Sequence, residues 1–284
     1  NKSHINLYVA LGIKSRACLA EGDWDGAFKA AKRVIDEGGY AVGTKSDLTG
    51  GMNSLDKQNV MWGAGIQVAD QAGGYAGFFT HMDNKEGAYA KSAPKLISKQ
   101  LYNRISATDI RRDWWDPSDK ESPYVSKKFS FANVASFLGD YIYMRVEEMY
   151  FTAAEAALRL DDLKSARELM NTVMAERDPG YSANNRSGTL LGATTTTWTG
   201  SFLENILTHR RIELWGEYGR LFDVRRLGQG IDRRTDDGFS EECISMMNRR
   251  NVNITKADTY DWVLTIPKAE LDANPNINEE DQNP

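Results

Sequence analysis

The stretch Leu203–Gly228, LENILTHRRIELWGEYGRLFDVRRLG, carries more structural information than any other part of the chain. At helical spacing it sets out a charged row formed by Arg210, Glu213, Glu217 and Arg220. Beside that row runs an apolar one formed by Ile212, Trp215, Gly219 and Phe222. Residues three and four apart share a helix face, so the stretch predicts one helix with one buried and one charged side. It contains no recognisable nucleophile, metal cage or phosphate loop, which favours a structural helix with paired charges.

Two segments outside this stretch resemble each other and predict helix–turn–helix units, at Tyr8–Ile35 and Tyr150–Met174. Corresponding positions carry the same kind of residue, namely Leu19 and Leu158, Ala27 and Ala166, and Val34 and Val173. Alanine lets paired helices approach closely, as tetratricopeptide units require. Asp25 and Asp162 are the expected N-caps of the second helices. Such repeats recur about every 34 residues, so the wide separation of these two indicates a large insertion.

The insertion, at about residues 40–140, is the least helical part of the sequence. Asn59–Val68 is predicted to be extended, and Gln71–Thr80 is a glycine-rich aromatic loop. Lys95–Ile105 predicts a short helix, and Asp113–Ser122 a polar turn with two tryptophans. The fold class that follows is all-α, with tetratricopeptide-like helix–turn–helix repeats, a long irregular insertion and minor β structure.

Three ordered sequence blocks carry a family resemblance. Arg210–Arg226 follows the order R-R-x-E-L-x-x-E-x-x-R-x-x-D-x-x-R, and Arg145–Ala156 follows R-x-x-E-x-Y-x-x-x-A-E-A. The third block comprises Ile266–Leu271, Asn274–Ile277 and Gln282–Pro284. Together these blocks resemble the SusD/RagB family, the surface glycan-binding lipoproteins of Bacteroidetes outer membranes. The chain departs from the family pattern at two places. Tyr218-Gly219 replaces the usual Gly-x, and Asn278–Asp281 is an insertion. These departures indicate a divergent branch of the family.

The resemblance implies a function in nutrient uptake. Members of the family are non-enzymatic; they capture an oligosaccharide or polysaccharide at the cell surface and deliver it to a SusC-like TonB-dependent transporter of the outer membrane. The implied attachment to the membrane is an N-terminal lipid anchor. Residues 1–22 show neither a signal peptide nor a lipidation cysteine.

Family members are usually longer, with two earlier helical repeats. We therefore expect one SusD-like domain, residues 1–284, that lacks its N-terminal part. Its expected parts are a helical repeat (1–39), the insertion with ligand-facing loops (40–140), a second repeat with the charged helix (141–228) and a mixed C-terminal region (229–284).

Composition excludes several classes of function. A net charge of −5 and a pI near 5.4 argue against nucleic acid as a partner, because that role needs a basic face. No apolar run approaches the length of a membrane span. With two cysteines and three scattered histidines, the sequence supports neither a disulfide framework nor a zinc site. We expect no cofactor and no metal.

The expected glycan site rests on loop aromatics. Pyranose rings stack their C–H faces on flat aromatic rings while neighbouring polar groups bind the hydroxyls. Two patches meet this need, Tyr75, Phe78 and Phe79 in the glycine-rich loop, and Trp114 and Trp115 beside Arg111. Because consecutive tryptophans cannot easily face the same way, we expect one to pack inward and the other to be partly exposed. A loop aromatic can equally plug the protein beneath it. The sequence around Trp62 is compatible with either a ligand-binding or a core position.

Two other functions remain open. The first is an α-helical glycosidase or lyase. A cleft with two carboxyl groups about 5–10 Å apart would be evidence for it. The second is a helical-repeat scaffold that binds protein partners on its concave face. One apparent enzyme motif fails. Gly38–Ser46 nearly matches a Walker A loop, but Thr44 stands where lysine is needed and the stretch follows a predicted helix.

Overall fold

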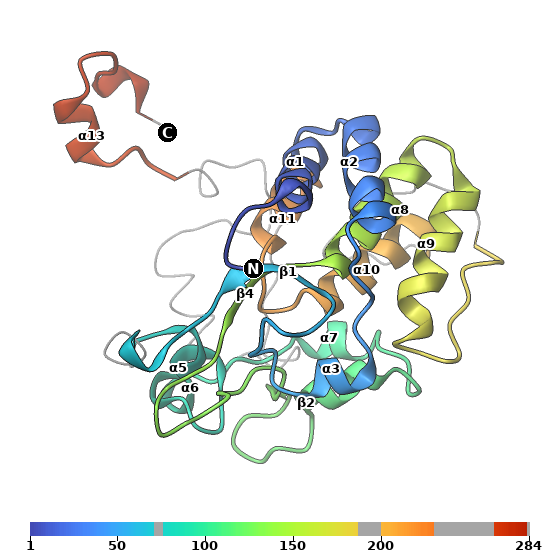
Figure 1. Ribbon diagram of the computed structural model, residues 1–284, viewed down its shortest axis with the longest axis horizontal. Helices are drawn as coiled ribbons and strands as arrows, with labels where there is room; N and C mark the ends of the chain where they lie inside the picture. Colours follow the sequence, from blue (N-terminus) through green and yellow to red (C-terminus); the bar gives the residue numbers. More distant parts are fainter. Residues whose placement is uncertain (71–75, 187–199, 230–263, 283–284) are drawn as a thin grey trace.

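A computed structural model describes residues 1–70, 76–186, 200–229 and 264–282 (Figure 1). The longer helices are α1 (Leu7–Glu21), α2 (Trp24–Glu37), α8 (Val146–Arg159), α9 (Leu163–Ala175), α10 (Phe202–Glu213) and α11 (Arg220–Arg226). Shorter helices are α3 (Lys45–Thr49), η1 (Val68–Asp70), α5 (Phe78–Met82), α6 (Ala88–Ser92), α7 (Lys99–Tyr102), η2 (Ile110–Trp114), α13 (Lys268–Ala273) and η5 (Glu279–Asp281). The strands are β1 (Val60–Ala64), β2 (Trp115–Asp116), β3 (Val125–Ser126) and β4 (Tyr141–Arg145). The fold is mostly helical, as expected.

The two predicted helix–turn–helix units are confirmed as the hairpins α1–α2 and α8–α9, which lie side by side in Figure 1. Asp162 caps α9, its side chain accepting a hydrogen bond from the Ser165 backbone N–H. The prediction that Asp25 caps α2 is wrong. Asp23 does so instead, because the helix already begins at Trp24.

The main core lies where α8 meets α2, α9 and α10. α8 is rich in alanine, and nearly all of its residues are buried. Ala27 on α2 and Ala166 on α9 are both completely buried, which agrees with the close helix approach expected of these positions. Small side chains let neighbouring helices approach and pack closely.

The insertion builds a second core from aromatic side chains, below the helical layer in Figure 1. The insertion also contains the antiparallel pair β2–β3 and strand β1, which pairs antiparallel with β4, and strand β4 leads directly into α8. The extended structure expected within Asn59–Val68 is confirmed by β1. The helix expected over Lys95–Ile105 is shorter than predicted, since α7 spans Lys99–Tyr102. Helix α5 begins at Phe78, within the stretch Gln71–Thr80 that was expected to be a loop.

The stretch from Leu203 to Gly228 is two helices rather than one. α10 ends at Glu213, and α11 begins after Gly219. Between them Gly216 and Gly219 adopt φ values of +74° and +111°, a conformation that residues with a side chain rarely take. We call residues 214–219 the linker loop. It breaks the predicted charged row: Glu213 and Glu217 both bind Arg145, whereas Arg210 binds Asp223.

Candidate functional site

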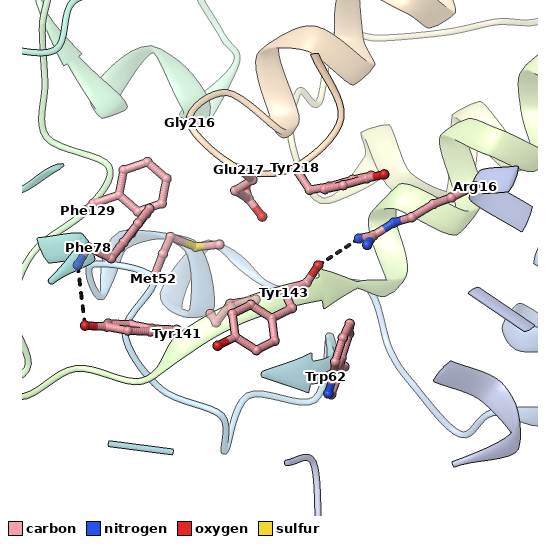
Figure 2. A pocket seen from close by; sticks show the side chains of 11 residues that line it. Arg16, Met52, Trp62, Phe78, Phe129, Tyr141, Tyr143, Gly216, Glu217 and Tyr218 are labelled. Atoms are coloured by element: carbon pink, nitrogen blue, oxygen red, sulfur yellow. Dashed lines mark hydrogen bonds between the residues drawn. The ribbon is translucent and has the colours of Figure 1, made fainter. Parts of the chain in front are cut away.

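A cavity of about 490 Å³ opens where β1 and β4, α1 and the linker loop meet. Its wall is mainly aromatic and is formed by Arg16, Met52, Trp62, Phe78, Phe129, Tyr141, Ile142, Tyr143, Gly216, Glu217 and Tyr218 (Figure 2). We call it the aromatic cavity. Segments far apart in the sequence meet here, so the site depends on the whole fold rather than on one loop.

Trp62 and Tyr143 form one end of the aromatic cavity. They lie on the neighbouring strands β1 and β4, with their ring centroids 5.1 Å apart in an edge-to-face arrangement. The strand register is irregular on both sides of Trp62. Gly63 permits this close pairing, since a Cβ there would lie 2.2 Å from the Tyr141 carbonyl oxygen. Tyr143 is 40% exposed, so aromatic surface remains open to solvent beside Trp62.

Arg16 extends from α1 to the same end of the cavity and is held on three sides. Its Nη2 donates to the Tyr143 carbonyl oxygen at 2.7 Å, as Figure 2 shows, and its Nε donates to Glu148 at 2.8 Å. Its guanidinium carbon lies 3.9 Å from the ring centroid of Tyr218. This contact is a cation–π interaction that fixes the tyrosine against the cavity wall.

Glu217 anchors the linker loop from beneath. Arg145 donates to both of its carboxylate oxygens at 2.8 Å, and Lys128 Nζ lies 2.5 Å from Oε1. Burial alone would raise the pKa of Glu217, but these two cations lower it below its usual value. Glu217 is therefore a charged structural anchor, and its neighbour Tyr218 is presented to the cavity.

Lys128 also holds the linker loop and the end of α10 through hydrogen bonds to their backbone. Its Nζ donates to the carbonyl oxygens of Glu213 at 2.7 Å and Trp215 at 2.8 Å. It also lies over the Trp114 ring, 4.5 Å from the centroid. Burial lowers the pKa of Lys128 to about 8, against the opposing attraction of Glu217. One buried lysine thus contacts the end of α10 at Glu213 and the linker loop at Trp215 and Glu217.

Glu213 lies at the centre of a buried charge network below the cavity. Its carboxylate accepts hydrogen bonds from Arg111, Arg145 and Arg177, which come from three separate segments. The arginines hold the pKa of Glu213 well below its usual value although burial opposes them. Each arginine also pairs with a second carboxylate, Arg111 with Asp109, Arg145 with Glu217 and Arg177 with Glu147. The network joins the insertion to α10, and thereby sets the position of the linker loop.

The structure corrects the expected exposure of the tryptophan pair. Trp114 is 3% exposed and Trp115 is 1% exposed, so neither offers a face to a sugar. Both can point into one core because the backbone changes from the η2 helix to the β2 strand between them. Their rings meet edge to face with centroids 5.8 Å apart. Arg111, expected beside them as a ligand residue, is completely buried and bonded to Asp109.

The two described aromatic residues of the glycine-rich loop, Phe78 and Phe79, lie in different parts of the structure. Phe78 lines the aromatic cavity, where its ring packs edge to face on Phe129 with centroids 5.2 Å apart. Phe79, only 2% exposed, belongs to the second core instead. Tyr75 lies outside the described residues. Of the expected residues that are described, Phe78 is therefore the one that lies in the cavity wall.

Sequence reasoning did not single out Arg16, Tyr143 or Tyr218, and left the role of Trp62 open. A weak signal existed for Trp62 in the predicted extended segment around it. Tyr143 lies in a short strand directly before the Arg145 helix block, where no strand was expected. Nothing in the spacing of Arg16 indicates that it reaches the β1–β4 pair. These residues become a site only through tertiary packing.

The aromatic rings of the cavity wall can stack on a ligand, and its polar groups can hydrogen-bond. Its charged side chains, Arg16 and Glu217, are paired with oppositely charged residues. Glu217 is the one carboxylate among the described residues that line it, and both its oxygens are engaged. A glycosidase site needs two carboxyl groups flanking the scissile bond. Within the described residues, no group of three or more His, Cys, Asp or Glu side chains is placed to hold a metal ion. None of the described helices is long and apolar enough to span a membrane.

Comparison with solved structures shows the same fold. A SusD-like carbohydrate-binding protein from Bacteroides vulgatus ATCC 8482 is 26% identical, with a TM-score of 0.76 over 98% of this chain and 60% of its own length. A SusD superfamily protein from Bacteroides thetaiotaomicron VPI-5482 is 23% identical, with a TM-score of 0.75 over 100% of this chain and 61% of its own.

A surface glycan-binding protein A from Bacteroides uniformis shares 16% identity, with a TM-score of 0.66 over 99% of this chain and 61% of its own length. The chain thus spans about three fifths of the length of each of these neighbours.

The sequence comparisons agree with the structural ones. No curated protein matches the chain. The family model described as the SusD family matches residues 116–284, which is more than half of the sequence and includes the three blocks quoted above. The chain belongs to the SusD family.

Proposed function

We propose that this chain is a non-enzymatic glycan-binding protein and that the aromatic cavity is its binding site. The observation that carries the proposal is the edge-to-face pair Trp62–Tyr143 at an open, mostly aromatic cavity. A sugar ring can place its apolar face on such a wall and its hydroxyls toward polar groups at the rim. Family membership supports the same function, as does the similarity to the SusD-like carbohydrate-binding protein from Bacteroides vulgatus.

The charge state of the wall favours a neutral glycan. Arg16 is paired with Glu148, and Glu217 is paired with Arg145 and Lys128. A ligand carboxylate or sulfate would find no unpaired cation among the described lining residues. Neutral hydroxyl groups, in contrast, need no counter-charge and can hydrogen-bond to the hydroxyl of Tyr143.

Absence of catalysis is part of the proposal. The described wall of the cavity supplies one carboxylate, Glu217, and its pKa is lowered rather than raised, so it cannot hold the proton that a general acid needs. We further propose that the protein acts at the cell surface, where it passes its glycan to a TonB-dependent transporter of the outer membrane. Family membership supports this last step.

The experiment is a binding screen against neutral polysaccharides and their oligosaccharides, followed by calorimetry. Shallow stacking sites give millimolar to micromolar dissociation constants, about −4 to −8 kcal/mol. Trp62→Ala should weaken binding about tenfold, since buried aromatic contacts carry most of the energy of such sites. Trp24→Ala is the matched control, because Trp24 packs under Arg159 and lies outside the aromatic cavity.

Reducing ends are counted in the same samples over a day. A constant count with measurable binding supports the proposal. A rising count would show hydrolysis or lyase activity and would overturn the non-enzymatic part. Binding that is equally strong in Trp62→Ala and the unmodified chain would overturn the assignment of the site.

A further inference from the structure

A second hollow adjoins the aromatic cavity. It has a volume of about 380 Å³ and lies between α1 and α11. Three residues, Arg16, Trp62 and Tyr218, line both hollows. We call the second hollow the helical groove. In Figure 2 these three residues stand together at one end of the aromatic cavity, so the two spaces meet at a shared wall.

The helical groove has an aromatic surface of its own. Phe222 on α11 is 49% exposed, and its ring is stacked on that of Tyr218 with centroids 5.3 Å apart and an interplanar angle of 28°. Opposite it, α1 contributes Ile13 and the small, exposed Ala17. An exposed aromatic ring in a groove with apolar walls is a surface on which a sugar ring can lie.

The charges of the helical groove are satisfied within the protein. Arg210 Nε donates to Asp223 at 3.0 Å, and Arg226 Nη1 lies 2.7 Å from Glu155. Together with the pairing of Arg16 and Glu148, this accounts for every cation among the described residues that line the groove. An anionic ligand would again find no unpaired partner. Asp223, which also accepts from Arg226, keeps acceptor capacity for hydroxyl groups.

We propose that the helical groove is a second sugar subsite, next to the aromatic cavity, so that the protein selects neutral oligosaccharides long enough to occupy both. This inference rests on the proposed function. The occupant is the extension of the glycan held at Trp62, because the two hollows share Arg16, Trp62 and Tyr218 and have the same neutral, aromatic character. A monosaccharide or disaccharide fills one hollow, whereas a longer chain gains contacts with Phe222.

The test is a calorimetric series with neutral oligosaccharides of two to seven sugar units, taken from the malto-, cello-, xylo- or laminari-series that binds in the screen. Affinity should rise at least about fivefold between the shortest and longest members. Phe222→Ala should remove most of that rise and leave disaccharide binding unchanged. Ala17→Trp should do the same by filling the groove.

Two control variants accompany these changes. Leu160→Ala removes a comparably exposed apolar side chain outside both hollows, and Ala175→Trp adds an indole at an exposed position on α9. Both should bind the whole series as the unmodified chain does. Phe222 and Ala17 are exposed, so thermal melting should show all four variants folded.

The outcomes separate the inference from the proposed function. If the disaccharide binds and Trp62→Ala weakens that binding about tenfold, the proposed function stands. Affinity that does not depend on length, or Phe222→Ala that matches the unmodified chain throughout, would then overturn the second subsite. If no member of any series binds, the proposed function fails and the inference fails with it. If Phe222→Ala changes self-association instead, the groove is a protein-docking surface, which also overturns the proposal.

Discussion

Arg145 holds Glu217 through both carboxylate oxygens, with Nε to Oε2 and Nη2 to Oε1 each 2.8 Å long. Arg145 ends strand β4 two residues after Tyr143, and Glu217 directly precedes Tyr218 in the linker loop. This one bidentate ion pair therefore fixes the spacing between two tyrosines that line the aromatic cavity. A bidentate arginine–carboxylate pair is directional as well as strong, which suits a positioning role.

Glu217→Gln should destabilise the protein and loosen the site together. The substitution leaves Lys128 and Arg145 buried without their shared carboxylate, and loss of one partner of a buried pair costs about 3–5 kcal/mol. Urea unfolding measures the loss, and calorimetry measures the accompanying drop in glycan affinity. Asp25→Asn is the control, since its ion pair with Lys29 is exposed and should matter little. Equal stabilities for the two variants would contradict a structural role for Glu217.

Acid should unfold the protein through its buried carboxylates. The pKa values of Glu155, Glu213, Glu217 and Asp223 are all lowered by neighbouring arginine or lysine side chains, against the effect of burial. A carboxylate with a lowered pKa stabilises the fold above its unfolded value, and that stability is lost as pH falls through the folded value. The free energy of unfolding should therefore fall below about pH 4.5, the ordinary value for glutamate. Urea titrations at pH 7, 5, 4 and 3.5 that gave one constant free energy would refute this.

Lys128 should also make the free energy of unfolding rise with pH, but in alkaline solution. Its pKa is about 8 in the folded protein and 10.5 ordinarily. Between these values the unfolded chain binds the proton and the folded chain does not, so the free energy of unfolding rises with pH, by at most about 1.4 kcal/mol per unit. Measured from pH 7.5 to 10, the unmodified protein should gain stability relative to Lys128→Met. A difference that stays flat over that range would exclude the shifted lysine.

Gly216→Ala should distort the linker loop. The residue has a φ of +74°, and a Cβ would lie 2.6 Å from Phe129 Cε2 and 2.8 Å from Met82 Cε. The left-handed conformation alone costs a side chain about 1–2 kcal/mol, and the contacts add to that. We expect a lower melting temperature and weaker glycan binding. Gly39→Ala is the comparison, since Gly39 also has a positive φ but open space around its Cβ. Equal losses in the two variants would show that packing against Phe129 is unimportant.

The sequence predicted the scaffold well because local patterns determine it. Ala27 and Ala166 recur at the same place in two hairpins, and the charged blocks around Arg145 and Arg210 identify the family. The helix break after Glu213 was missed, because the pattern around Gly216 and Gly219 fits a continuous helix until the backbone angles are known. Helical periodicity does not show where a glycine leaves the helical region of backbone angles.

The site was less predictable for a physical reason. Trp114 and Trp115 have the local sequence of exposed ligand residues, yet tertiary packing buries both against Trp215 and Phe129. Trp62 and Tyr143 meet only because β1 pairs with β4, two segments separated by most of the insertion. Which aromatic is buried depends on such long-range pairings, and a single sequence does not reveal them. Of the aromatic residues that the sequence singled out, Phe78 lines the proposed site, whereas Phe79, Trp114 and Trp115 are buried in the second core.

The central claim is that a glycan binds at Trp62, and a structure of the complex tests it most directly. The unmodified chain is crystallised with the tightest oligosaccharide of the screen. We expect a sugar ring on the wall formed by Trp62 and Tyr143, within about 4 Å of the indole, the distance of van der Waals contact. An oligosaccharide bound elsewhere, with the aromatic cavity open to solvent alone, would contradict the account.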